Sequence, residues 1–73
     1  MIMQIQLNGE NRPLDNDTSL LQLLESLDLI GKRLAIEING EIIPKSKHAS
    51  HQLQDGDRVE IVHAIGGGQP QTF

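Results

Sequence analysis

Three two-residue turn signals constrain the fold of this 73-residue chain more than any other feature. Asn8-Gly9, Asn39-Gly40 and Asp55-Gly56 each stand beside short segments in which apolar and polar residues alternate. Asn-Gly and Asp-Gly favour tight turns, and a period of two is typical of a strand with one buried face. The sequence therefore predicts several short strands joined by tight turns.

The first turn joins two strands at the beginning of the chain. Residues 1–7 alternate, so that the apolar side chains share one face, and a short second strand follows over residues 12–14. Pro13 cannot donate a backbone hydrogen bond, which places this second strand at an edge of the sheet.

The second turn joins residues 34–38 to residues 41–43, where Pro44 stops the strand. A polar segment over 45–50 is expected to form a short helical turn. The third turn precedes the last strand, residues 58–65, whose inward pair is Val59 and Ile61.

One helix of about ten residues is expected between the two hairpins, because leucines recur there at helical spacing, at Leu20, Leu23, Leu24 and Leu27. Thr18 or Asp17 is expected to cap its first turn, and Gly31 to end the segment. The resulting order is β-β-α-β-β-turn-β. It predicts an α+β fold of the β-grasp, or ubiquitin-like, kind, with a mixed four- to five-stranded sheet and one helix on one face.

Composition excludes several classes of function. The formal net charge is -4, and the only aromatic residue is Phe73, so neither phosphate contacts nor base stacking is favoured and no nucleic acid is expected. No apolar run approaches the length of a membrane span, and residues 1–7 do not resemble a signal peptide. The absence of cysteine excludes disulfides and thiolate chemistry and suits a cytoplasmic protein.

Candidate catalytic and metal-binding patterns are weak. His48 and His51 have metal-ligand spacing but no third ligand nearby, and a pair of exposed histidines is expected instead. Asp15 and Asp17 lack the glycine and the distal glutamate of a calcium loop. No serine has an adjacent base that would mark a nucleophile. We therefore expect no catalytic residue, no metal and no bound cofactor.

Glycine dominates the end of the last strand. The composition changes at Gly66, which divides the chain into a domain over residues 1–65 and a flexible tail over residues 66–73. An extended segment without side chains can thread a narrow channel to a distant active site. A carboxylate at the end of such a segment can be activated as an acyl-adenylate, so the chain would offer one reactive atom to other enzymes.

The segment LAIEINGEIIPKSKHASHQLQDGDRVEIVHAIGGG, residues 34–68, closely resembles the ThiS family of sulfur carriers in thiamine biosynthesis. The shared pattern is a strand, a short hairpin, Pro-Lys-Ser, Leu-x-Asp-Gly-Asp, an apolar strand and a closing diglycine. A looser similarity covers the first half, through IQLNGE and the leucine helix.

This resemblance implies a role for the glycine run. Gly68 would be adenylated with ATP by a ThiF-like enzyme, and a sulfur relay from a cysteine desulfurase would convert it to a thiocarboxylate. The sulfur would then be used by thiazole synthase, ThiG. Gly66 and Gly67 would form the threading segment.

A partner surface is expected on the outward face of the last strand. Val62 and Ala64, with Ile65 next to the tail, are predicted to form a small apolar patch for the adenylating enzyme. Arg58 and Glu60 on the same face would supply electrostatic complementarity.

The chain departs from the family pattern because Gln69-Pro70-Gln71-Thr72-Phe73 follows the diglycine. Gly68 then has no free carboxylate, so we expect a processing peptidase to cut after it. Phe73 is a candidate recognition residue for that peptidase. The alternatives are an unnatural extension or a chain that has lost carrier function. Other functions compatible with the fold are the small subunit of molybdopterin synthase, a ubiquitin-type protein modifier joined through Gly68, and a plain interaction module.

Overall fold

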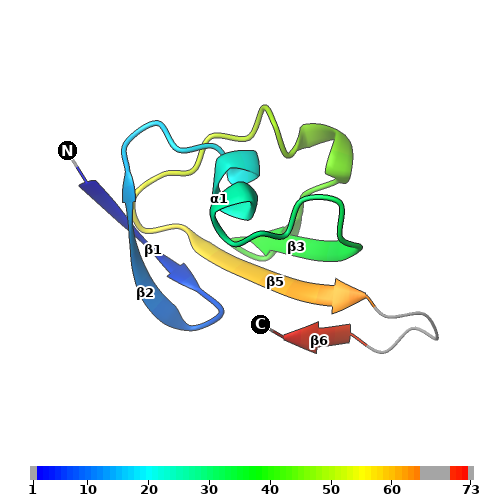
Figure 1. Cartoon of the computed structure of the whole chain (residues 1–73). Helices are drawn as coiled ribbons and strands as arrows, with labels where there is room; N and C mark the ends of the chain where they lie inside the picture. Colours follow the sequence, from blue (N-terminus) through cyan, green and yellow to red (C-terminus); the bar gives the residue numbers. More distant parts are fainter. Residues whose placement is uncertain (1, 65–69, 73) are drawn as a thin grey trace.

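The computed structural model describes residues 2–64 and 70–72 (Figure 1). Its elements, in chain order, are β1 (Ile2–Leu7), β2 (Glu10–Asp15), α1 (Leu20–Ser26), β3 (Leu34–Ile38), β4 (Glu41–Ile42), the 3-10 helix η1 (Lys45–Lys47), β5 (Arg58–Ala64) and β6 (Pro70–Thr72). The predicted order β-β-α-β-β-turn-β is confirmed, and β6 is added to it.

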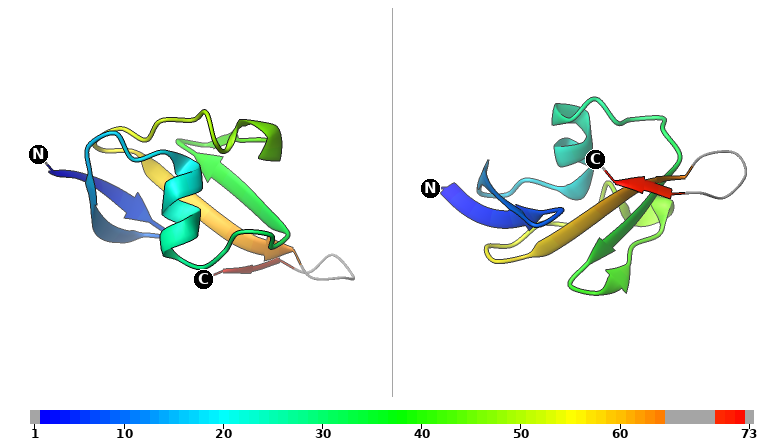
Figure 2. Two further views of the ribbon diagram at one scale, coloured as in Figure 1. Left: turned by 45° about the horizontal axis from the view of Figure 1, so that its top comes forward. Right: turned by 90° about the horizontal axis from the view of Figure 1, so that it is seen from below.

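The strands form one mixed sheet in the order β2-β1-β5-β3-β4, with β6 paired to β5. β1 and β5 are parallel, and the other pairs are antiparallel. Pro13 lies in the edge strand β2, opposite Gln4, as predicted. Helix α1 lies across one face of this sheet (Figures 1 and 2), which is the predicted β-grasp arrangement.

The core fills the space between α1 and the sheet. The helix contributes Leu20, Leu23 and Leu24, and alternate residues of the strands point toward it, including Ile5, Ile36 and Ile61. Each of these side chains is at most 2% exposed. Burial of one such aliphatic side chain contributes about 1.5–3 kcal/mol. The alternation seen in the sequence is therefore the cause of the layered arrangement.

The start of α1 differs from the prediction. Ser19, not Thr18 or Asp17, is the N-cap. Its hydroxyl accepts a hydrogen bond from the backbone N–H of Gln22 at 3.1 Å, and the side-chain oxygen of Gln22 accepts one from the backbone N–H of Ser19 at 2.9 Å. The Thr18 hydroxyl is used elsewhere, because it donates to the Asp15 carbonyl at 2.6 Å. This reciprocal capping box starts the helix one residue later than a cap at Thr18 would. The helix ends at Ser26, with Leu27 as its C-cap, before the predicted end of the segment at Gly31, so α1 has seven residues rather than about ten.

The structure adds a short strand within the segment that was predicted to be the tail. The sequence predicted a flexible tail, whereas Pro70–Thr72 form β6, in which Thr72 lies opposite Val62 and Pro70 opposite Ala64. The proposed boundary between a domain over 1–65 and a tail over 66–73 stays a prediction. No helix among the described residues has the length and apolar character needed to cross a membrane.

Candidate functional site

Four of the five predicted partner residues lie on β5, the central strand. Arg58 and Glu60 are exposed and Val62 is half-buried, on the face opposite the buried Val59 and Ile61. Ala64 is the last residue of β5. The backbone register thus confirms which face of the strand Arg58, Glu60 and Val62 occupy, although their role in binding a partner stays a prediction.

The glycine run is not part of the described structure. Ile65 and Gly66–Gly68, which were predicted as the root of the tail, the threading segment and the reactive end, lie outside the described residues. In the sequence they stand between β5 and β6. The described part of the candidate site is therefore β5, the strand that precedes the glycine run in the sequence.

The Leu53-x-Asp-Gly-Asp motif fixes the beginning of that strand. The Asp55 carboxylate accepts a hydrogen bond from the backbone N–H of Gln4 at 2.7 Å, which joins the turn to β1. The Asp57 carboxylate accepts one from the Gln54 amide at 2.9 Å and one from the Asn39 side chain at 3.0 Å. Charge-assisted bonds of this kind are stronger than neutral ones. The motif that marks the family thus has a structural role, which is to position β5.

Both edges of β5 have hydrogen-bonding partners. β3 pairs with one edge over Val59 to His63. On the other edge, β1 pairs with Arg58 and Val59, and β6 pairs with the last three residues of the strand. Between them, the Asn8 side chain accepts from the Ile61 amide at 2.8 Å and donates to the Ile61 carbonyl at 3.2 Å. The Asn8 side chain therefore makes the hydrogen bonds to Ile61 that a neighbouring strand would otherwise make.

The histidine pair is not exposed as predicted. His48 is only 8% exposed, and its Nε2 lies 3.2 Å from the Ile43 carbonyl oxygen. The segment containing it packs against α1, where the carbonyls of His48 and His51 accept hydrogen bonds from the Leu21 and Leu20 amides. These bonds satisfy amides that a helix leaves unpaired at its first turn, so the segment caps α1.

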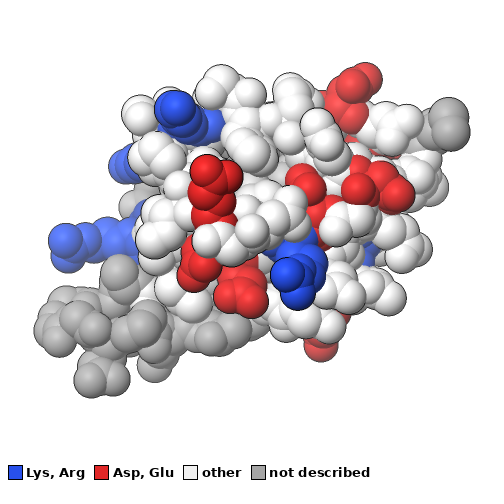
Figure 3. All heavy atoms as spheres, turned by 180° about the vertical axis from the view of Figure 1, so that it is seen from behind, with Lys and Arg blue, Asp and Glu red and all other residues white. Residues whose placement is uncertain are grey.

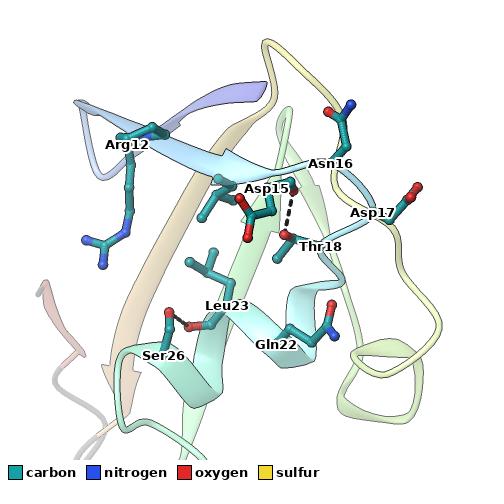
Figure 4. A pocket seen from close by; sticks show the side chains of 10 residues that line it. Arg12, Asp15, Asn16, Asp17, Thr18, Gln22, Leu23 and Ser26 are labelled. Carbon is teal, nitrogen blue, oxygen red and sulfur yellow. Dashed lines mark hydrogen bonds between the residues drawn. The ribbon is translucent and has the colours of Figure 1, made fainter. Parts of the chain in front are cut away.

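The acidic turn before α1 borders a shallow pocket of about 590 Å³ (Figure 4). The side chains of Asp15 and Asp17 point in different directions there, so they do not face a common point. Among the described residues, no group of three or more His, Cys, Asp or Glu side chains could hold a metal ion.

One α-helix across a mixed sheet, with a glycine run after the central strand in the sequence, is the arrangement of a ubiquitin-like β-grasp protein. The ThiS family matches residues 5–68. A crystal structure of the thiamine biosynthesis protein ThiS from Geobacter metallireducens superposes with a TM-score of 0.78 at 28% identity, covering 90% of this chain and all of that one. The chain therefore belongs to the ThiS family.

Curated relatives are of two sizes. The sulfur carrier protein ThiS of Bacillus subtilis is 43% identical over 65 residues, which are 88% of this chain and 98% of the relative. The thiazole synthase of Paramagnetospirillum magneticum is 41% identical over 70 residues, which are 96% of this chain but 22% of that enzyme. The chain thus spans about a fifth of the length of this relative and of a second thiazole synthase, from Magnetococcus marinus.

Sequence reasoning missed the residues that position β5. Asn8 and Asn39 were interpreted only as turn residues, and the hydrogen bonds of their side chains depend on partners up to 53 positions away. The family motif was a signal for Asp55 and Asp57. No local pattern indicates the Asn8 contact, because it requires the parallel pairing of β1 with β5.

Proposed function

We propose that this chain is a sulfur carrier for the thiazole ring of thiamine, and that its reactive group is the carboxyl of Gly68. The observation that carries the proposal is the family match, which ends at Gly68 and leaves the following five residues outside it. The relatives named sulfur carrier protein ThiS, which this chain matches over 98–100% of their length, support the same assignment.

In the proposed reaction the carrier supplies the carboxylate and its partners supply the chemistry. A carboxylate oxygen attacks the α-phosphorus of ATP on a ThiF-like enzyme, forming an acyl-adenylate and releasing pyrophosphate. The outer sulfur of a persulfide, passed from a cysteine desulfurase, then displaces AMP and forms an acyl disulfide with the relay protein. A thiol of the partner cleaves the S–S bond and is oxidised to a disulfide, which releases the terminus as a thiocarboxylate. Adenylation consumes ATP, which suits the cytoplasmic location that we propose for the chain. The chain is a carrier rather than an enzyme in this scheme, and it binds no cofactor itself.

Thiazole synthase is the proposed acceptor of the sulfur. Its support is that regions similar to this chain occur within two proteins named thiazole synthase. Gly66 and Gly67 would let the terminus reach an enclosed active site, because glycine places no side chain against the walls of a channel.

Removal of residues 69–73 by a peptidase is part of the proposal. The carbonyl of Gly68 forms a peptide bond with Gln69, so Gly68 has no free carboxylate to activate. The pairing of β6 with β5 adds a second reason, since β6 lies beside Val62 and Ala64 of the predicted partner patch. Cleavage would free the carboxylate and this edge of β5 together.

The outer face of β5 is the proposed contact for the adenylating enzyme. Val62 is half-buried and lies opposite Ala35 of β3, while Arg58 and Glu60 are exposed along the same face. Val62→Glu places a charge in this patch and is expected to slow adenylation at least about tenfold. A variant adenylated at the unmodified rate would remove the patch from the proposal.

The proposed function is tested with a chain that ends at Gly68, incubated with ATP, a ThiF-like enzyme and a sulfur donor. Mass spectrometry should show the exchange of one oxygen for one sulfur at the terminus. A chain that ends at Gly67 is the matched control, and the full chain should remain unmodified. Absence of the exchange in the chain that ends at Gly68, with an enzyme active on another ThiS protein, would contradict the proposal.

The processing step has its own test. The protein isolated from its own cells should give a mass that corresponds to a Gly68 terminus. A full-length product that never yields this terminus would exclude cleavage, and with it the proposed activation of Gly68.

A further inference from the structure

A groove with an apolar floor and a basic rim lies between α1, the loop that follows it and η1. Its volume is about 590 Å³. We define this basic groove by Leu24, Leu29, Ile30, Lys32, Arg33 and Lys45, which are among its lining residues. None of these residues belongs to the predicted patch on β5, and nothing in the proposed function uses them.

The floor of the basic groove is apolar because two buried leucines and one exposed isoleucine line it. Leu24 and Leu29 are 2% and 7% exposed, whereas Ile30 is 51% exposed. A turn places Ile30 there: the Lys32 amide donates to the Leu29 carbonyl at 3.2 Å, and Gly31 has a φ of +82°, in the left-handed region that glycine favours.

The rim has the opposite charge to the rest of the molecule. Three of the six Lys and Arg residues of the chain line the basic groove, and no Asp or Glu does, although the chain has ten. On the face shown in Figure 3, most of the visible Lys and Arg side chains gather toward one end, and Asp and Glu side chains lie over much of the remainder. An acidic protein with a local basic rim around an apolar floor is suited to an acidic partner.

The basic groove lies at the end of the molecule where β5 ends. Leu34, another of its lining residues, pairs with His63, the residue before the last of β5 (Figure 1). An enzyme that binds the glycine run after β5 therefore lies at the end of the molecule where the basic groove is.

We propose that the basic groove docks a segment of an enzyme that receives the glycine tail, and that this segment carries one protruding apolar side chain between carboxylates. The apolar side chain would lie on Ile30 and Leu29, and the carboxylates would pair with Lys32, Arg33 and Lys45. Such an arrangement, apolar at the centre and charged at the rim, is that of a protein interface. This inference rests on the proposed function, because the partner is one of the enzymes named there.

The test measures binding of the full chain, and of the chain ending at Gly68, to the ThiF-like enzyme and to thiazole synthase, at low and high salt. The double variant Lys32→Glu/Arg33→Glu is expected to weaken binding to at least one enzyme about tenfold or more at low salt, with a smaller salt dependence. Ile30→Ser is expected to weaken it about fivefold. Circular dichroism confirms that each variant is folded.

Two variants serve as controls. Arg12→Glu reverses an Arg outside the groove, and Ile2→Ser removes an isoleucine of β1 that is 70% exposed and lies away from the end of β5. Both should bind within about twofold of the original chain, as surface changes outside an interface do.

The outcomes separate this inference from the proposed function. If neither form of the original chain binds either enzyme, the proposed function fails and the inference fails with it. If the original chain binds and the groove variants bind as tightly as the controls, only the basic groove is excluded. Self-association lost in the groove variants, without any change in enzyme binding, would assign the groove to a second copy of the chain and overturn the proposal.

Discussion

The Asn-Gly dipeptide occurs twice in this chain, and the two copies attach to β5 in different ways. Both form tight turns with positive φ, +50° and +86° at Asn8-Gly9 and +53° and +83° at Asn39-Gly40. Asn8 follows β1 and Asn39 follows β3, the two strands that flank β5. The same turn signal therefore occurs on both sides of the central strand.

The side chains of the two asparagines have different partners. The Asn8 side chain makes two hydrogen bonds to the backbone of the buried residue Ile61, at 2.8 and 3.2 Å. Asn39 accepts from the exposed Arg58 amide at 2.9 Å and donates to the Asp57 carboxylate at 3.0 Å. The comparison shows that a turn motif can have a second role that its local sequence does not reveal.

The largest effect is expected from Asn8→Ala. This change removes two part-buried hydrogen bonds, leaves the Ile61 amide without its Asn8 acceptor, and puts alanine in the left-handed region. The free energy of unfolding should fall by about 3 kcal/mol. Urea denaturation measures it. Asn8→Asp keeps an acceptor for the Ile61 amide and should cost less, so equal losses would contradict the assigned role.

Asn39→Ala is expected to cost less, about 1.5–2 kcal/mol, because its side-chain bonds are exposed. The strain at positive φ is nearly the same as at residue 8, so the difference between the two alanine variants isolates the side-chain bonds. Here the Asp variant should be worse than the Ala variant, since it places a second carboxylate beside Asp57. The order of the Asp and Ala variants thus reverses between the two turns.

The smallest difference is expected between Gly9→Ala and Gly40→Ala. A Cβ added at either position meets no atom within 4 Å, so only the strain at positive φ opposes the change. Each variant should lose about 1 kcal/mol, with a difference below about 0.5 kcal/mol. Thermal and urea unfolding of the pair provide the measurement. A large difference would mean that the turns differ in more than their asparagine side chains.

Local patterns were sufficient to predict most of the fold. The turns at Asn8 and Asn39 and the buried Leu20, Leu23 and Leu24 follow from local conformational preference and period. The edge position of β2 follows from Pro13. The helix cap was assigned wrongly, because Thr18 and Ser19 are chemically alike and only the reciprocal Gln22 contact distinguishes them.

The candidate site was less accessible to prediction. The glycine run and the family motif indicated Gly68 and the importance of Asp55-Gly56-Asp57. The burial of His48, the pairing of β6 and the basic groove depend on segments far apart in the sequence coming together. Periodicity carries no information about such contacts.

The parallel pairing of β1 with β5 also has a kinetic consequence. Asn8 and Ile61 are 53 positions apart, and the sheet cannot close until β5 has joined β1 to β3. Contacts between distant residues slow folding, and during synthesis the strand that completes the sheet leaves the ribosome late. Because the glycine run begins two residues after the end of that strand, a partly folded chain would lack the ordered β5 that leads to it. Completion of folding and presentation of the glycine run to a partner enzyme would then both depend on the pairing of β5 with β1 and β3.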